Sequence, residues 1–165
     1  MTSRGVDLHV NPSEETIRLG PLALRFLITG EHATGSVAVF EVLVPSGQRL
    51  AAPAHSHDHY EETVYGIEGV LTWTVDGRQI DVGPGQALRI PRGAIHRFDN
   101  NGGQDVKGLC VITPAAIGPQ YFREVAEVIQ RSGWRDAGPS KDSRDHDPPR
   151  PHASYAAAPG VATSG

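Results

Sequence analysis

The sequence predicts an all-β fold that is completed by a C-terminal amphipathic α-helix. Two observations predict the strands: short apolar runs follow one another between residues 16 and 117, and glycine, proline, asparagine and aspartate separate them. A third predicts the helix, because the apolar period changes after Gly118. Many short strands separated by such turns are typical of a sandwich or barrel. We therefore expect a β-barrel at 16–117 and a helix at 118–134.

The first expected strands lie on either side of a Gly20-Pro21 turn, in the sequences TIRLG and LALRFLITG. The next run, SVAVFEVLV, is almost continuously apolar, which is typical of a strand covered on both faces. A turn at 45–47 leads from it into a further strand that carries the first histidines. A strong two-residue hairpin signal follows at Asp76-Gly77. The remaining strands are expected at 62–68, 70–75, 78–82, 87–90, 96–98 and 106–113.

The helix is expected in the sequence PQYFREVAEVIQRSG, where Gly133 stops it. Its apolar stripe contains Tyr121, Phe122, Val125, Val128 and Ile129, with charges opposite, so about three turns would cover one end of the barrel. The polar residues 1–15 are expected to form a flexible N terminus. Residues 135–165 are rich in proline, alanine, serine, glycine and charge, which predicts a disordered tail.

Composition excludes several classes of function. A net charge of -4 without a basic cluster argues against a nucleic-acid partner. No apolar stretch approaches membrane-spanning length, and the first residues lack the apolar core of a signal peptide. The single cysteine, Cys110, lies in an alternating run and is expected in the core, where it can form no internal disulfide. A reducing, cytoplasmic location is expected.

Two stretches carry candidate metal ligands. In PAHSHDHYEETVYGIEG, His55 and His57 are two residues apart, so on a strand both imidazoles point to one face. Glu62 follows after room for a tight turn. The hairpin brings back GQALRIPRGAIHRFDN, in which His96 is the fourth candidate. Imidazole nitrogens with a carboxylate oxygen suit first-row transition metals.

These stretches resemble the two sequence motifs of the cupin superfamily. The GPQYF sequence together with the helix that it opens resembles the ending of small, single-domain, quercetinase-like cupins. The resemblance covers about residues 35–115, with one departure: Arg49 stands where the first motif usually has glycine. The matching residues are His55, His57, Glu62 and Gly69 in the first motif, and Gly85, Pro91, Gly93, His96 and Asn100 in the second.

The resemblance implies a double-stranded β-helix, the jelly-roll barrel of cupins, whose leading strands often pack across a homodimer. It also implies one divalent transition metal ion, which is iron, manganese, nickel, copper, cobalt or zinc, held by His55, His57, Glu62 and His96. Two alternatives from the residues stay open. A shifted register would use His57 with His59, although Glu62 then follows too closely. The neighbouring Glu61 is expected either to face solvent or to contact a metal ligand without binding the metal itself.

The function that the quercetinase-like resemblance implies is that of a dioxygenase. Its small organic substrate would chelate the metal through adjacent oxygens, because the ligand set leaves coordination positions open. Glu62 would act both as a ligand and as the catalytic proton acceptor. Phe98 is expected near the metal, and Trp73 either lines the substrate pocket or fills the core.

Two other functions remain possible on the same barrel, because one fold hosts many activities. The first is a non-redox isomerase, decarboxylase or lyase, in which the metal polarises a sugar acid or a small carbonyl compound. It predicts arginines in the pocket, and the candidates are Arg89, Arg92 and Arg97, although turn positions beside a strand are usually at the surface. The second is a small-ligand-binding barrel without enzyme activity.

Overall fold

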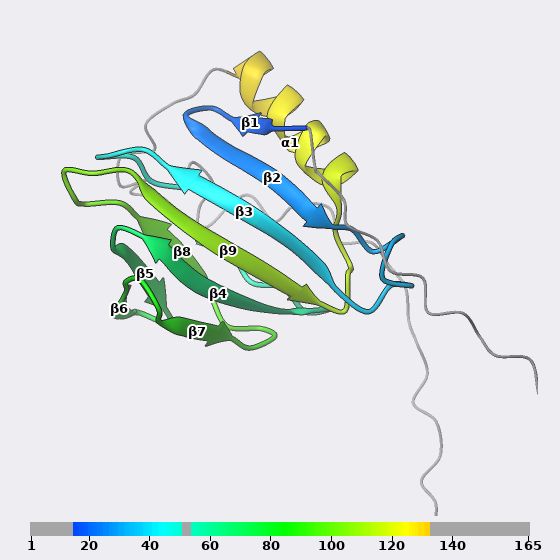
Figure 1. Cartoon of the computed structure of the whole chain (residues 1–165), viewed down its shortest axis with the longest axis horizontal. Coiled ribbons are helices and arrows are strands. Elements are labelled where there is room, and N and C mark those ends of the chain that lie inside the picture. The colour runs from blue at the N-terminus through cyan, green and yellow to red at the C-terminus, as the bar shows by residue number, and fades with distance from the viewer. Residues whose placement is uncertain (1–14, 51–53, 133–165) are drawn as a thin grey trace, which may run out of the picture.

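The computed structural model describes residues 15–50 and 54–132. The predicted N terminus, apart from Glu15, and the predicted tail therefore lie outside the described residues. Within them the expected short strands and the C-terminal helix are confirmed (Figure 1). The elements are β1 (Ile17–Leu19), β2 (Leu22–Ile28), β3 (Ala38–Val44), β4 (Glu61–Glu68), β5 (Leu71–Val75), β6 (Arg78–Val82), β7 (Ala87–Ile90), β8 (His96–Asp99), β9 (Val106–Thr113) and α1 (Pro119–Ser132).

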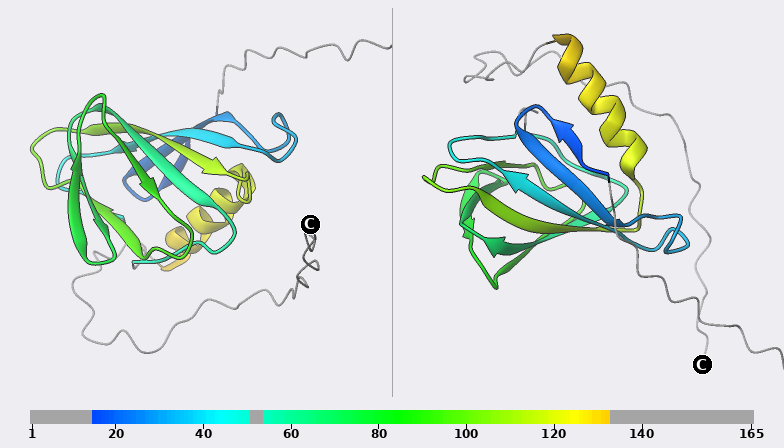
Figure 2. Two further views of the ribbon diagram at one scale, coloured as in Figure 1. Left: turned by 90° about the horizontal axis from the view of Figure 1, so that it is seen from below. Right: turned by 45° about the horizontal axis from the view of Figure 1, so that its top comes forward.

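The strands form two antiparallel sheets. The large sheet has the order β1-β2-β3-β9-β4-β7, and the small sheet has the order β6-β5-β8. Phe40, Val42 and Cys110 point inward from the large sheet, while Trp73 and Phe98 point inward from the small one, and all five belong to one buried cluster. The small sheet lies over the β4 and β7 side of the large sheet, and α1 lies at the opposite side, next to β1 (Figures 1 and 2).

The predicted hairpin is confirmed and joins β5 to β6. Asp76 and Gly77 have φ of 45° and 78°, the left-handed values that a two-residue type I′ turn requires. The Asp76 carboxylate also accepts a hydrogen bond from the Ile95 N–H at 2.9 Å. The turn is thereby tied to the residue that directly precedes His96.

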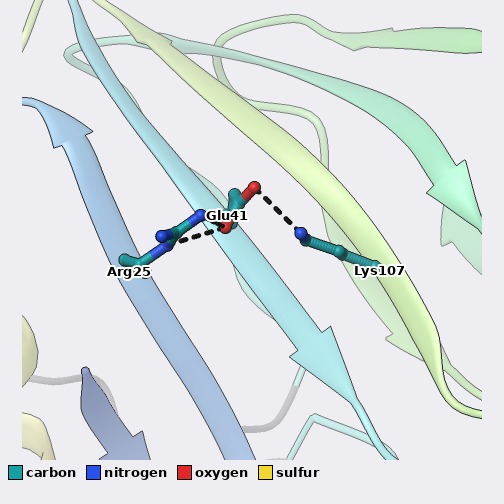
Figure 3. A network of polar contacts seen from close by, with 3 residues as sticks. All are labelled: Arg25, Glu41 and Lys107. Carbon is teal, nitrogen blue, oxygen red and sulfur yellow. Dashed lines mark hydrogen bonds and ion pairs between the residues drawn. The ribbon is translucent and has the colours of Figure 1, made fainter. Parts of the chain in front are cut away.

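The prediction that residues 36–44 are covered on both faces is wrong. Every second side chain of β3 is buried, but Glu41 and Leu43 face outward, and Leu43 is 38% exposed. On this outer face Arg25 Nε donates to Glu41 Oε2 at 2.8 Å, and Lys107 Nζ lies 3.1 Å from Glu41 Oε1 (Figure 3). Burial raises the pKa of Glu41, but the two cations outweigh it and lower that pKa. Side-chain ion pairs thus add to the backbone ladders that join β2, β3 and β9 on this outer face.

The expected strand carrying the first histidines is also wrong. Between β3 and β4 the described residues form only two isolated bridges, Arg49 to Asp99 and His55 to His96. The second bridge is a closely spaced pair in which His55 N–H donates to His96 O at 3.1 Å and His96 N–H donates to His55 O at 2.8 Å. The bridge between His55 and His96 therefore takes the place of the regular strand that was expected to carry the histidines.

Helix α1 packs against the inner face of the large sheet, next to β1. Phe122, Val125 and Ile129 pack against the core, and the Phe122 ring lies 5.4 Å from the ring of Phe40 between centroids. Val128, predicted on the same stripe, is 61% exposed. None of the described residues forms a helix that is long and apolar enough to cross a membrane.

Candidate metal centre

Three histidines converge in the space between the sheets. The coordinating nitrogens of His55, His57 and His96 all lie within 4.8 Å of one another. The ring centroids of His55 lie 4.8 Å from those of His57 and His96, and the remaining pair is 5.0 Å apart. The structure thus brings together the three histidines that the motif spacing singles out. His59 is exposed and lies outside this group, so the shifted register is not supported.

Glu62, the second residue of β4, lies beside two of these rings. Its Oε2 atom is 3.4 Å from His96 Nε2 and 3.9 Å from His57 Nε2. Its side chain is 12% exposed, so the carboxylate is largely shielded from bulk water. The four predicted ligands therefore form one cluster, in which the carboxylate lies next to His96 and His57.

The orientation of His96 leaves one nitrogen facing the cluster. Its Nδ1 atom lies 3.0 Å from the carbonyl oxygen of Ala94, which can only accept a hydrogen bond. Nδ1 is therefore placed to donate to this carbonyl, and Nε2 faces Glu62 and the other histidines. Backbone carbonyls commonly fix metal-ligating histidines in this way.

Two of the histidines have shifted pKa values of opposite sign. Burial, followed by the neighbouring His55, lowers the pKa of His57 from 6.5 to about 4. Burial also acts to lower the pKa of His96, but hydrogen bonds with Glu62 and the Ala94 carbonyl outweigh it, and the pKa of His96 is raised. At neutral pH His57 is thus a neutral imidazole, the form that binds a metal.

These shifts predict how the metal-free protein titrates. His57 is expected to protonate near pH 4 and His96 above the usual value, as followed by NMR of the two imidazoles. Between pH 6.5 and about 4 the unfolded chain binds more protons at His57 than the folded one does, so the His57 contribution to stability falls as pH falls. The His96 contribution has the opposite sign and is lost as pH rises through its raised pKa. A His57 midpoint near 6.5 would contradict this prediction.

Two residues near the cluster were not predicted to belong to it. The ring of Tyr60 is buried and stacks on the imidazole of His57, with centroids 4.3 Å apart and planes 23° apart. The buried Cys110 thiol is hydrogen-bonded to Glu62, and burial, followed by this carboxylate, raises its pKa. The core position expected for Cys110 is confirmed. Tyr60 and Glu62 are two residues apart, so in an extended chain their side chains share a face. This spacing was the one sequence signal for a place of Tyr60 near the cluster.

The cluster lies in the wall of a cavity of about 120 Å³. Trp73 and Phe98, the two residues predicted to bind substrate, both line it, and their ring centroids are 5.0 Å apart. The rest of the wall comes mainly from apolar side chains of the large sheet, the loops and α1: Leu19, Leu22, Leu24, Phe40, Val42, Leu50, Tyr60, Cys110, Ile112, Ile117, Tyr121, Phe122 and Val125. A mostly apolar cavity with a few convergent polar groups is the usual form of a small-molecule site.

The arginines that a sugar-acid site would need do not contribute to this wall. Arg89 makes two hydrogen bonds to Glu61, of 2.9 and 2.7 Å, on the outer face of the large sheet. Arg97 pairs with Asp99, and Arg92 is exposed. Among the described residues that line the cavity, none is lysine or arginine. Glu61 points away from the histidines, as one of the two readings of the sequence expected.

The donor set fits a divalent transition metal ion. Three imidazole nitrogens and a carboxylate oxygen are the ligands that such ions accept, and here they converge within a largely buried cluster. His57 is in the neutral form that coordination requires, and the Nε2 atom of His96 faces the cluster. His55, His57 and His96, with Glu62 beside two of them, could therefore hold one ion.

Comparisons with known proteins agree with this geometry. The sequence profile described as "Cupin domain" matches residues 40–112. A quercetin 2,3-dioxygenase of Bacillus subtilis is 28% identical over 108 residues, which are 64% of this chain and 30% of that protein. The chain thus spans less than a third of the dioxygenase. The polyketide synthase CurC of Streptomyces cyaneus is 30% identical over 105 residues, covering 64% of this chain and 67% of that protein.

Solved structures share the fold. A predicted oxalate decarboxylase from Thermotoga maritima superimposes with a TM-score of 0.57 at 22% identity, over 65% of this chain and 99% of the other. The polyketide cyclase RemF from Streptomyces resistomycificus gives a TM-score of 0.54 at 24% identity, over 71% and 91% of the two chains. At these identities the similarity identifies the architecture alone.

Proposed function

The chain belongs to the cupin family and has its jelly-roll β-barrel fold, and on that premise we propose that it is a metal-dependent dioxygenase of a small organic substrate. One observation carries the proposal. Three imidazoles and a carboxylate converge in the wall of a cavity large enough for a ligand. A structural metal site is closed by its protein ligands, whereas an ion here would also face the cavity.

A redox-active divalent ion bound by His55, His57, His96 and Glu62 would supply coordination of a substrate with two adjacent oxygens and its oxidation by dioxygen. The chain's own residues prepare this chemistry. The Ala94 carbonyl holds the His96 ring in one tautomer, and Tyr60 stacks against His57, so both imidazoles are fixed in orientation. A substrate seated against the apolar wall would displace water, which would strengthen electrostatic interactions inside the cavity.

Glu62 is the group best placed to accept a proton from the substrate. It contributes the one carboxylate among the described residues that line the cavity. Its Oε2 atom lies 3.4 Å from His96 Nε2, so a substrate hydroxyl presented at the cluster would lie within reach of it. Glu62 therefore has both roles, ligand and proton acceptor.

Two further observations support oxygen chemistry over the alternative on a sugar acid. The Bacillus subtilis relative is by name a dioxygenase. Among the residues that the structure describes, the wall has no lysine or arginine that could neutralise a substrate carboxylate away from the metal ligands. The homodimer remains a prediction of the family resemblance, and sedimentation velocity would test it.

An oxygen-uptake screen tests the proposal. Protein loaded separately with iron, manganese, nickel, cobalt, copper or zinc would be mixed with catechols, 1,2-diketones and flavonols in an oxygen electrode. We expect substrate-dependent oxygen consumption with at least one redox-active ion and none with zinc. Turnover of a carbonyl compound by the zinc form without oxygen would instead identify Lewis-acid chemistry.

The two adjacent glutamates give a matched pair of variants for this assay. Glu62→Gln is expected to lower kcat by roughly 100- to 10,000-fold, the usual contribution of a positioned acid or base. Glu61→Gln should leave kcat within about twofold, because Glu61 pairs with Arg89 outside the cavity. Elemental analysis of both variants separates loss of the proton acceptor from loss of metal. Equal kinetic effects would contradict the role of Glu62.

A further inference from the structure

We propose that the cavity binds an uncharged substrate through a single aromatic ring, and that it rejects sugar acids and other polar anions. The inference rests on the proposed function and names the class of substrate for that site. It follows from the composition and charge of the cavity wall and from the volume of the cavity. Each of these three properties excludes a different class of ligand.

The composition of the wall excludes ligands with many hydroxyl groups. Away from the histidines and Glu62, most of the wall offers no side-chain hydrogen-bond partner, as at Leu24, Phe40 and Val125. The polar groups that remain belong to Tyr60, Trp73, Cys110 and Tyr121. A hydroxyl that loses its water without gaining a partner costs several kcal/mol in an apolar medium, roughly 2–7. A sugar carries several such groups. An aromatic ring carries none, and it gains from contact with Trp73 and Phe98.

The charge of the wall excludes anionic groups away from the metal. Glu62 is acidic, and among the described lining residues neither lysine nor arginine opposes it. A carboxylate at the far end of the ligand would therefore be buried without a counter-charge. Sites for anions usually provide a guanidinium or ammonium group.

The size of the cavity limits the buried part to about one ring. Its volume of about 120 Å³ is close to the roughly 150 Å³ of an engineered apolar cavity that binds benzene. A larger substrate must extend past the rim. Tyr121 of α1 lines the cavity while remaining 47% exposed, so it lies at this rim. Helix α1 therefore borders the part of the substrate that extends past the rim.

Binding can be measured with Trp73 as the reporter. The chain has two tryptophans, so Trp134→Phe leaves Trp73, which is 2% exposed and lines the cavity, as the single emitter. The zinc-loaded and the metal-free proteins would each be titrated with 4-methylcatechol, 3,4-dihydroxybenzoate and galacturonate. The first two share the ring and the adjacent oxygens and differ by a methyl group against a carboxylate. We expect 4-methylcatechol to bind at least about tenfold more tightly than either acid in both forms.

A pair of lysine substitutions on α1 tests the place of the ring. Tyr121→Lys puts a cation at the rim and is expected to raise affinity for 3,4-dihydroxybenzoate about tenfold relative to 4-methylcatechol. Val128→Lys is the control, because Val128 is 61% exposed and outside the described wall. Its preference should match that of the Trp134→Phe protein. If Tyr121→Lys leaves the preference unchanged as well, the ligand does not reach α1 and the inference is wrong.

The outcomes separate this inference from the proposed function. Equal or tighter binding of galacturonate or 3,4-dihydroxybenzoate would overturn the substrate class, even if oxygen uptake were observed. A protein that binds no metal or consumes no oxygen, but keeps the preference for 4-methylcatechol in its metal-free form, would overturn the dioxygenase and leave the substrate class supported.

Discussion

Replacing His96 by alanine is expected to weaken metal binding by more than roughly 100-fold, because even the loss of a residue that only supports a metal ligand costs about 10- to 100-fold. His96 is 2% exposed, and its Nε2 atom faces the cluster, so the imidazole cannot be replaced by a neighbour. His57→Ala should have the same effect. Isothermal titration with each divalent ion measures the change, and circular dichroism confirms that the β-structure persists.

His59→Ala is the matched control for this experiment. His59 lies two residues after His57 in the same segment, but it is exposed and outside the group of three converging histidines. Its removal should leave affinity within about twofold. If His59→Ala loses the metal and His57→Ala keeps it, the shifted register is correct and the assignment of the ligands is wrong.

The second large effect is expected at Asn100, which is a structural residue. Its side chain is 2% exposed, and Oδ1 accepts a hydrogen bond of 3.0 Å from Gly102 N–H. Its Nδ2 group donates to the carbonyl oxygens of Val44, Pro45 and Gln104 at 3.0, 3.1 and 2.9 Å. Asn100→Asp keeps the shape but places a carboxylate against three carbonyls. We expect a loss of about 3–5 kcal/mol in the free energy of unfolding.

Urea unfolding of the metal-free protein measures this loss. The neighbouring Asn101 is exposed, so Asn101→Asp should change the free energy of unfolding by less than about 0.5 kcal/mol and serves as the control. A stability of Asn100→Asp within 1 kcal/mol of the original protein would show that these hydrogen bonds contribute little.

Much of the fold could be predicted because most strands alternate and end at a turn. β6, β7 and β9 have the predicted bounds, and β4, β5 and β8 differ by one residue at one end. Gly69, which follows β4, explains one motif position: its φ is 71°, and a Cβ atom would lie 2.9 Å from the Asp105 carbonyl oxygen. Strand alternation and turn glycines depend on neighbouring residues alone, so they can be predicted from the sequence.

Three features could not be predicted, because each depends on a segment that is distant in the sequence and packs against the residues in question. Residues 36–44 are almost continuously apolar, and their sequence does not show that one face meets solvent, where Glu41 pairs with Arg25 and Lys107. The bridge between His55 and His96 joins segments 41 residues apart and replaces the expected strand. Val128 has the spacing of a buried residue. In the orientation of α1 that packs Phe122 and Val125 against the core, however, the Val128 side chain faces solvent.

The candidate site was predictable to the extent that motif spacing encodes it. His55, His57 and His96 converge as the spacing predicts, and Glu62 lies beside His96. The contact of Cys110 with Glu62 comes from the pairing of β4 with β9, in which Cys110 lies opposite Val64. That register is not visible in either strand alone. The same limit applies to Tyr121, which reaches the cavity through the packing of the helix.

The claim that a metal ion is bound by the histidine cluster is tested most directly by elemental mass spectrometry of untagged protein purified without chelator. We predict about one redox-active ion per chain, iron, manganese, nickel, cobalt or copper, in the original protein and in His59→Ala, and almost none in His96→Ala. A protein that contains no metal and takes up none when each ion is offered, or a His96→Ala variant that retains its ion in full, would contradict the claim.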